Sequence, residues 1–397
     1  MSFVAEFNRL PLAALLRPAR EADTTAVRQI LGQGNVSLAG FARLLSPAAA
    51  EFLEPMCRRS AGLTRQRFGR VIRLFAPLYL SNECVNNCRY CGFSRDNPIR
   101  RVTLSVDEVV REAEALKAQG FRNLLLVAGE HPRFVSHDYL TGCVRALHPE
   151  WPSLSLEVAP LSTEEYRPLV TAGAEGLVVY QETYDREVYA AMHTAGPKRD
   201  FNGRLETPER AYAAGFRRLG ISPLYGLADW RAEAICVAAH AQYLLRHCWK
   251  AQLTVSTVRL RPCAGEFQPL LPMSDRDLVQ LVCALRLFLP DVGLVLSTRE
   301  PPRLRDGLFP LGVTLISAGS HTEPGGYTGA GADKTHLTRG GRIVAASLAN
   351  PVARPATTDA TGQFLIADDR SPETVSAVLR HLGLEPVWKD GDPALTG

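Results

Sequence analysis

The sequence predicts an α/β fold: a TIM-type (βα)8 barrel with a helical extension before it and an appendage after it. About eight short apolar segments alternate with longer segments in which apolar residues recur every three to four positions, which is the pattern of strands alternating with helices. The short segments are rich in Leu, Val and Ile, which indicates parallel strands covered on both faces. A chain of 397 residues accommodates such a barrel with additions at both ends.

Residues 1–70 are predicted to form the helical extension. Apolar residues recur at helical spacing over residues 21–31 and 38–57, with Gly32 and Gly34 between the two stretches. No motif that carries chemistry falls in this part of the chain. We expect a layer of helices that closes one end of the main domain.

Residues 71–326 are predicted to form the barrel. Ser105 and Glu108 have the spacing of a capping box and mark the start of its first helix, which Gly120 ends. The expected strands cover residues 71–80, 124–127, 154–158, 177–180, 219–222, 253–258, 292–297 and 312–316. Helices are expected at 105–119, 163–172, 185–192, 207–214, 230–248 and 274–289. Without the last two strands, the sheet would be a partial barrel of six units.

Residues 327–397, the predicted C-terminal segment, break the alternation of strands and helices. Residues 327–362 are rich in Gly, Ala, Thr and Arg and show little periodicity, so we expect a mobile surface loop there. We then expect a strand over Gln363–Ala367, a final helix from Ser371-Pro372 to Gly383, and a tail over Glu385–Asp390.

The composition is that of an ordinary globular protein. The net charge is only +4, so we expect neither a nucleic-acid nor a membrane partner. No apolar run reaches the roughly 20 residues that span a bilayer, and the N-terminus lacks the features of a secretory signal. Only three of the nine cysteines cluster, and the others read as small buried apolar residues. This pattern is typical of a reducing compartment, so we expect a cytoplasmic protein.

Three cysteines, Cys84, Cys88 and Cys91, lie close together directly after the first expected strand. Their spacing is too tight for a disulfide framework, and a fourth ligand for a closed zinc site is lacking. Three thiolates on one short loop suit a four-iron cluster that leaves one iron open for a small chelating ligand. A structural zinc site is the alternative.

Further candidates stand where later strands end, because barrels of this type carry their active sites at that edge. Gly129 and Glu130 follow the second strand; on their own they would read as a solvated turn. Glu182 follows the fourth strand and is placed to accept hydrogen bonds from ribose hydroxyls. Arg204 stands before a helix and suits a carboxylate, with a surface ion pair as the alternative.

Four more charged residues fall inside strands or at their ends. Glu157 lies in the third strand, where an unpaired carboxylate is costly, so it meets either a cofactor or substrate group or a structural Arg. Arg259, Arg261 and Arg299 bring cations to the barrel mouth, where a substrate carboxylate is a natural partner. Salt bridges to carboxylates such as Glu300 are the alternative for at least one of them.

The cysteine loop, with Tyr90 directly before its last cysteine, resembles that of radical S-adenosylmethionine (SAM) enzymes. Further stretches resemble the family of 2-iminoacetate synthase, the tyrosine lyase of thiamine thiazole biosynthesis. They are Phe75–Asn82, Gly92–Ser94, Gly129–His131, Val179–Tyr184, Arg204–Pro208, Arg259–Pro262, Ser297–Glu300, Pro324–Tyr327 and Pro386–Lys389. The sequence departs from the family pattern in two places. Ala128 replaces the first glycine of the Gly-Gly-Glu turn of radical SAM proteins. The segment 328–360 is longer than we expect for the family.

The resemblance implies two cofactors, a [4Fe–4S] cluster and SAM, bound at the mouth of a (βα)8 barrel. Cys84, Cys88 and Cys91 would hold the cluster, and Tyr90, Gly129, Glu130, Glu182 and Arg204 would contact SAM. By analogy with related tryptophan lyases, Tyr79, Arg299 and Ser317 would contact the substrate.

The resemblance also implies a reaction. A radical derived from SAM abstracts hydrogen from the amino group of L-tyrosine, and the Cα–Cβ bond then breaks to give 2-iminoacetate (dehydroglycine) and p-cresol. No side chain is expected to be catalytic, because the radical comes from SAM. A lyase acting on another aromatic amino acid, such as tryptophan, is the alternative.

The implied partners are a reducing electron donor, such as flavodoxin or ferredoxin, and a thiazole synthase protein. The close relative that makes CO and cyanide for hydrogenase assembly carries an extra cluster of cysteines near its C-terminus. This chain has no cysteine after Cys283, so we do not expect that activity.

Overall fold

The computed structural model describes residues 2–344 and 360–388. Eight parallel strands pair in a closed ring, in which the last barrel strand returns to the first. In ring order they are β1 (Val71–Ser81), β4 (Asn123–Ala128), β5 (Ser153–Glu157), β6 (Gly176–Glu182), β8 (Arg218–Tyr225), β9 (Gln252–Ser256), β11 (Gly293–Leu296) and β12 (Leu315–Ser317). The predicted (βα)8 barrel is confirmed, including its last two strands.

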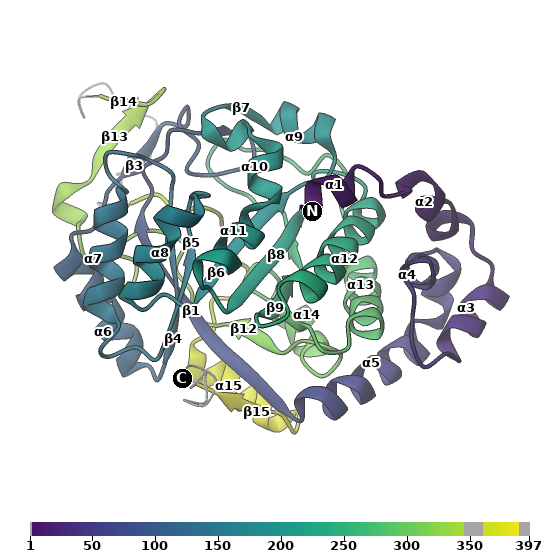
Figure 1. Ribbon diagram of the computed structural model, residues 1–397. Coiled ribbons are helices and arrows are strands. Elements are labelled where there is room, and N and C mark those ends of the chain that lie inside the picture. The colour runs from purple at the N-terminus through teal and green to yellow at the C-terminus, as the bar shows by residue number, and fades with distance from the viewer. Residues whose placement is uncertain (1, 345–359, 389–397) are drawn as a thin grey trace.

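A helix follows each barrel strand and covers the outside of the ring (Figure 1). These helices are α6 (Val106–Ala118), α7 (His137–Leu147), α8 (Thr163–Ala172), α11 (Thr207–Ala214), α12 (Trp230–His247), α13 (Asp275–Phe288), α14 (Pro302–Leu308) and α15 (Pro372–His381). Two further helices, α9 (Arg186–Met192) and α10 (Phe201–Leu205), stand between β6 and α11. The capping box predicted for α6 is present, with Ser105 and Glu108 each bonding the other's backbone N–H.

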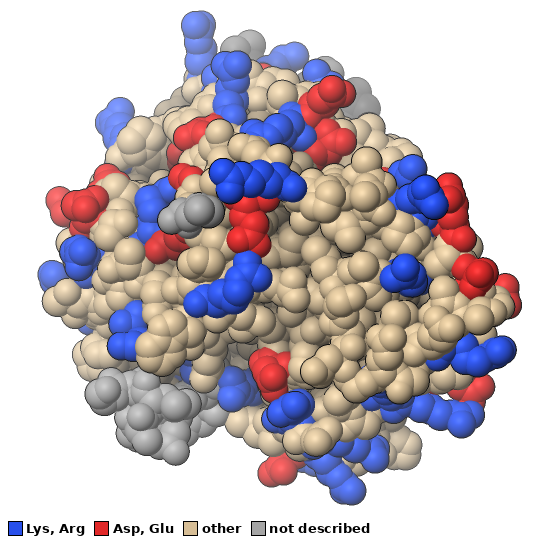
Figure 2. Space-filling model, turned by 45° about the vertical axis from the view of Figure 1, so that its right-hand side comes forward, with Lys and Arg blue, Asp and Glu red and all other residues tan. Residues whose placement is uncertain are grey.

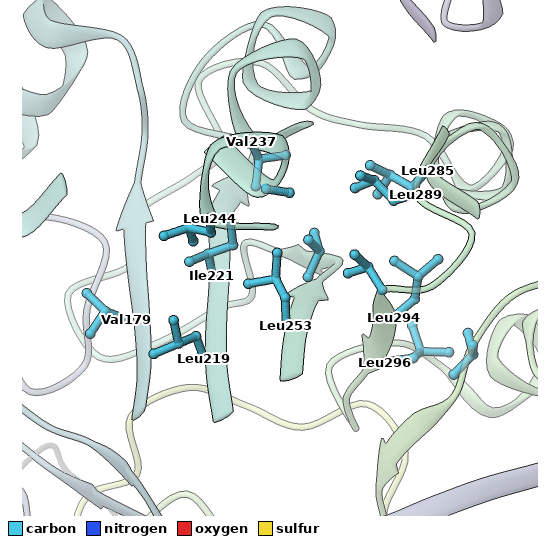
Figure 3. Close-up of a cluster of buried hydrophobic side chains, with 14 of the residues drawn as sticks. Val179, Leu219, Ile221, Val237, Leu244, Leu253, Leu285, Leu289, Leu294 and Leu296 are labelled. Carbon is cyan, nitrogen blue, oxygen red and sulfur yellow. The ribbon is translucent and has the colours of Figure 1, made fainter. Parts of the chain in front are cut away.

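Side chains alternate along each strand between the outer helices and the inside of the barrel. Figure 3 shows buried residues of β8 and β11, such as Ile221 and Leu294, on the side of the strands that faces Leu244 of α12 and Leu285 of α13. Residues that alternate with these, such as Val178 and Gly220, line an internal cavity of about 90 Å³. This period of two decides which strand-end side chains enter the mouth of the barrel.

The N-terminal helices form a layer beside the barrel, against its outer helices α12 and α13. They are α1 (Phe3–Phe7), α2 (Leu12–Glu21), α3 (Thr24–Leu31), α4 (Leu38–Leu44) and α5 (Leu53–Phe68), with a 3-10 turn at Ala48–Phe52 that divides the single long helix expected there. Phe3 stacks on His240 of α12 with ring centres 4.0 Å apart, and Phe41 meets Phe288 of α13 at 5.0 Å. The apolar stripes of these helices therefore bury themselves against α12 and α13 (Figure 1).

The C-terminal segment returns to both ends of the barrel. A small antiparallel sheet joins β3 (Ile99–Arg101) to β13 (His336–Arg339) and β14 (Arg342–Ile343). Part of the expected loop therefore forms two paired strands. At the other end, β15 (Glu385–Val387) pairs with the start of β1, where a tail was expected. The rest of the loop, residues 345–359, and of the tail, residues 389–390, lie outside the described residues, and mobility of the loop stays a prediction.

Residues Gln363–Ala367 form no strand, which corrects the prediction. They cross the barrel mouth as an extended segment whose backbone bonds to three different loops. The N–H groups of Gln363, Leu365 and Ala367 donate to the carbonyls of Thr322, Pro262 and Thr298 at 2.9, 2.8 and 2.9 Å. We call residues 360–368 the crossing segment. An apolar pattern alone did not distinguish such a segment from a strand.

Within residues 2–344 and 360–388, no helix has the length and apolarity needed to cross a bilayer. On the face shown in Figure 2, basic and acidic side chains are interspersed.

Candidate active site

The cysteine loop follows β1 and is tied down by buried polar side chains. The guanidinium of Arg101, 1% exposed, donates to the carbonyl of Asn82 at one end of the loop. It also donates to the carbonyls of Phe93 and Ser94 at the other end, at 3.0 and 2.7 Å. Arg101 therefore holds the two ends of the loop together. Its role was not predicted, because nothing in the sequence pairs it with these carbonyls.

The cysteines themselves are close enough for their charges to interact. Burial raises the pKa of Cys88 and raises that of Cys91 to about 11, while the ammonium of Lys198 lowers both and the neighbouring thiols raise them. Iron binding therefore has to displace protons from these thiols.

The three thiols fit an iron–sulfur cluster better than a single metal ion. Among the described residues, no three side chains of His, Cys, Asp or Glu converge as the ligands of one ion do. Thiolates on a cluster bind separate irons, so they need not meet at one point. Thiolates suit zinc as well as iron–sulfur clusters, so the softness of the donors does not separate the two. The lack of convergence on one point argues against the structural zinc alternative.

The end of β4 lies directly against the cysteine loop. A side chain on Gly129 would place its Cβ only 2.3 Å from the carbonyl oxygen of Glu83, so only glycine fits. The carboxylate of Glu130 accepts a hydrogen bond from Asn86 at 2.6 Å, and its carbonyl accepts one from the N–H of Val85 at 2.8 Å. The predicted Gly129–Glu130 turn thus packs against the cysteine loop and is hydrogen-bonded to it.

Glu182, at the end of β6, forms a buried charge cluster with two cations. Its backbone has φ of 72°, a conformation that side chains rarely adopt and that occurs at functional sites. Lys198 donates to its carboxylate at 2.7 Å, and Arg204 lies 3.7 Å from the same oxygen. Burial would raise the pKa of Glu182, but the two cations hold it below its usual value.

The two cations beside Glu182 border a surface cavity of about 380 Å³. Glu130, Lys198 and Arg204 line it together with Arg210 and Asp200. Lys198 was missed by sequence reasoning. Its position in a turn before the predicted Arg204 was the available signal, but no spacing rule linked it to Glu182.

Tyr90 is anchored on the other side of the cysteine loop. Its hydroxyl bonds the Nε2 of His193 at 2.7 Å, and burial holds that imidazole neutral by lowering its pKa to about 3. Tyr90 packs in an apolar cluster with Cys88, Leu224 and Leu227. The apolar turn after β8 therefore lies beside the cysteines.

Tyr79 and the cysteine loop are joined by a residue of the crossing segment. The hydroxyl of Tyr79 donates to Oε1 of Gln363 at 2.8 Å, and Nε2 of the same amide lies 3.9 Å from the sulfur of Cys91. The N–H of Gly92 donates to the Gln363 carbonyl at 3.0 Å. Gln363 was not predicted, because the segment was read as a strand.

Arg299 and Ser317 lie side by side at the ends of β11 and β12. The Oγ of Ser317 accepts from the N–H of Thr298 at 3.2 Å, next to Arg299. The guanidinium of Arg299 lies over the Phe364 ring and makes no ion pair with any residue in 2–344 or 360–388. A cation held in place but unpaired is available to an anionic ligand.

The other two mouth arginines differ from Arg299. Arg259 donates to Glu300 and pairs with Asp275 at 2.8 Å, so the salt-bridge alternative holds for it. The Nε of Arg261 is buried without a hydrogen-bond partner among the described residues.

Known proteins match the chain over almost its whole length. A family model for the Radical SAM superfamily matches residues 78–236, and one for the Biotin and Thiamin Synthesis associated domain matches residues 256–385. The 2-iminoacetate synthase of Salmonella typhimurium is 43% identical over 367 residues, which cover 92% of this chain and 90% of the relative. The chain belongs to the 2-iminoacetate synthase family. The Escherichia coli member is 44% identical over 353 residues, which cover 89% of this chain and 86% of that one.

Membership of this family establishes the class of chemistry. The chain is a radical SAM lyase whose cofactors are a [4Fe–4S] cluster and SAM. Among solved structures, the FeFe-hydrogenase maturase HydG from Carboxydothermus hydrogenoformans is 32% identical with a TM-score of 0.79. The match covers 98% of this chain and 82% of that one.

Proposed function

We propose that this lyase cleaves the Cα–Cβ bond of L-tyrosine to 2-iminoacetate and p-cresol, for thiamine thiazole biosynthesis in the cytoplasm. The observation that carries the proposal is the unpaired guanidinium of Arg299 at the barrel mouth, beside Ser317. An amino-acid carboxylate is the partner that such a guanidinium binds best. All nine cysteines are free, which supports a reducing compartment.

The cofactor side of the site is assigned to the cysteine loop and its surroundings. When bound, the cluster and SAM together supply a 5′-deoxyadenosyl radical. Cys84, Cys88 and Cys91 hold the cluster in this proposal. Tyr90, Gly129, Glu130, Glu182 and Arg204 hold SAM, and the bonds described above keep these residues in place.

The substrate side is assigned to the opposite half of the mouth. Arg299 and Ser317 bind the carboxylate of tyrosine, which orients the amino acid by its charged end. Tyr79 lies on the same inner face of β1 as Phe75, which lines the internal cavity, and it contacts the substrate near the cluster. No side chain of the chain forms a covalent bond with the substrate.

The partners belong to the same proposal. A reducing electron donor, such as flavodoxin or ferredoxin, supplies the electron that the cofactors need, and a thiazole synthase protein receives 2-iminoacetate.

An anaerobic product assay tests the proposal. Reconstituted protein is incubated with SAM, a reductant and either L-tyrosine or L-tryptophan. We expect p-cresol and 5′-deoxyadenosine with tyrosine. Deoxyadenosine formed with tryptophan alone would overturn the choice of substrate in favour of the alternative lyase.

Two variants separate the halves of the site in that assay. Cys88→Ala is expected to abolish deoxyadenosine formation, because one iron loses its ligand. Arg299→Ala is expected to weaken tyrosine binding by about 10- to 100-fold with little change in SAM binding, since a charged hydrogen bond is worth about 1.5–3 kcal/mol. Equal loss of both affinities would remove Arg299 from the substrate pocket.

A further inference from the structure

Glu157 is a carboxylate inside the barrel that the roles assigned so far do not use. It is the last residue of β5 and lies opposite Val127 of β4. Ser153 and Ser155, four and two positions before it, line the internal cavity. Since side chains alternate along a strand, Glu157 enters the same interior, one layer nearer the mouth.

This carboxylate has no partner in the part of the chain that the structure describes. No hydrogen bond or ion pair reaches it, whereas Lys198 and Arg204 are engaged with Glu182, and Arg259 with Glu300. The predicted alternative of a structural Arg finds no ion pair among the described residues, although the charge of Arg299 acts on Glu157. A half-buried carboxylate without a partner is costly, which points to a ligand.

Positively and negatively charged side chains on the surrounding elements both lie near Glu157. Burial and then Glu182 of β6 raise its pKa to about 7, while Arg299, after β11, lowers it together with Lys198 and Arg204. The phenols of Tyr79 on β1 and Tyr180 on β6 also face it. A carboxyl that titrates near neutral pH suits proton transfer better than an ordinary one.

We propose that Glu157 receives the amino group of the amino-acid substrate and accepts one proton from it. The inference rests on the proposed function and adds a residue to it. An N–H bond of the substrate ammonium breaks, an O–H bond forms on the carboxylate, and the nitrogen keeps the electron pair. Arg299 and Glu157 together then match the two charged ends of a free amino acid.

The proton transfer has a chemical purpose. Hydrogen abstraction from a neutral amine leaves a neutral nitrogen radical, whereas abstraction from an ammonium leaves a radical cation of much higher energy. A base beside the amino group therefore prepares the substrate for the radical step.

Two ligands test the binding half of the inference. L-tyrosine is compared with 3-(4-hydroxyphenyl)propanoate, which lacks only the amino group, by equilibrium dialysis against anaerobic holoprotein with SAM. We expect the wild type to prefer tyrosine, and Glu157→Gln to lose about 10- to 100-fold of that preference, as expected for a charged hydrogen bond. Ser155→Ala, one layer lower on the same face, is the matched control and keeps the preference.

A pH profile tests the proton-accepting half. In the wild type, the rate of p-cresol formation is expected to rise with pH through about 7, as Glu157 loses its proton. In Glu157→Gln this limb disappears, and Glu157→Asp retains it with a lower rate. SAM affinity and iron content stay as in the wild type, which distinguishes the effect from misfolding.

The outcomes separate this inference from the proposed function. If the wild type forms p-cresol while Glu157→Gln keeps both the preference for tyrosine and the pH-dependent limb, only the inference is overturned. If the wild type forms no p-cresol from tyrosine, the proposed function fails and the inference fails with it. Loss of SAM affinity in Glu157→Gln, with the tyrosine preference intact, would move Glu157 to the cofactor side.

Discussion

The guanidinium carbon of Arg299 lies 3.4 Å from the centre of the Phe364 ring. Arg299 stands at the end of β11, and Phe364 belongs to the crossing segment that covers the mouth. The contact therefore makes the C-terminal segment part of the proposed substrate site. It also explains how a cation stays in a fixed position at the mouth without an ion pair.

Replacing Phe364 by Leu is expected to weaken tyrosine binding. The substitution keeps an apolar side chain but removes the ring, and a cation–π contact contributes about 0.5–2 kcal/mol, which corresponds to roughly 3- to 30-fold in affinity. The measurement is tyrosine affinity of the SAM-bound protein. Leu365→Ala is the control, because the Leu365 side chain is 63% exposed and carries no aromatic ring that could contact Arg299. Equal affinities in Phe364→Leu and wild type would contradict the role of the ring.

Tyr79 and Gln363 are expected to be energetically coupled. Their hydrogen bond of 2.8 Å joins β1 to the crossing segment. A double-mutant cycle with Tyr79→Phe and Gln363→Ala, measured by urea unfolding of the iron-free protein, is expected to give about 0.5–1.5 kcal/mol of coupling. Additive effects of the two substitutions would show that the bond contributes nothing to stability.

Gly129→Ala is expected to impair cluster assembly. The added Cβ would lie 2.3 Å from the Glu83 carbonyl and 3.4 Å from the side chain of Cys84, so the loop has to move. We expect a loss of most bound iron, measured by iron analysis and visible absorbance after reconstitution. Gly62→Ala is the matched control, because a Cβ at Gly62 in α5 meets nothing within 4 Å. Full iron content in Gly129→Ala would show that the loop tolerates the displacement.

The ion pair between Arg305 and Asp368 is expected to anchor the crossing segment. Both side chains are fully buried, so Asp368→Asn leaves Arg305 without its counter-charge and is expected to cost about 3–5 kcal/mol of unfolding free energy. Asp306→Asn removes the more exposed partner of Arg370 and is expected to cost about 0–1 kcal/mol. Similar losses in both variants would contradict this assignment.

The same pair predicts a pH dependence of stability. Burial would raise the pKa of Asp368, but bonds from Arg370 and Arg305 hold it below its usual value. A carboxylate with a lowered pKa stabilises the fold above its unfolded pKa, and this stabilisation is lost as the pH falls through its folded pKa. The difference in urea stability between wild type and Asp368→Asn is therefore expected to shrink in acid. A difference that grows in acid would show the opposite sign.

The sequence by itself determined the barrel and most strand-end candidates. The period of two along each strand places Tyr79, Glu157 and Glu182 on its inner face, and a parallel barrel brings the carboxyl ends of all its strands to one mouth. The three cysteines of one loop needed no distant contact to be recognised. These features follow from local patterns, which a linear sequence displays directly.

Only the tertiary structure decided which charged residues are free. Arg259 and Arg299 look alike in the sequence, yet one is neutralised by Glu300 and the other lies over Phe364. Gln363 bonds to Tyr79, 284 positions earlier in the chain, from a segment with no regular period. Pairing over such separations depends on where loops cross the barrel mouth, and no local propensity encodes that crossing.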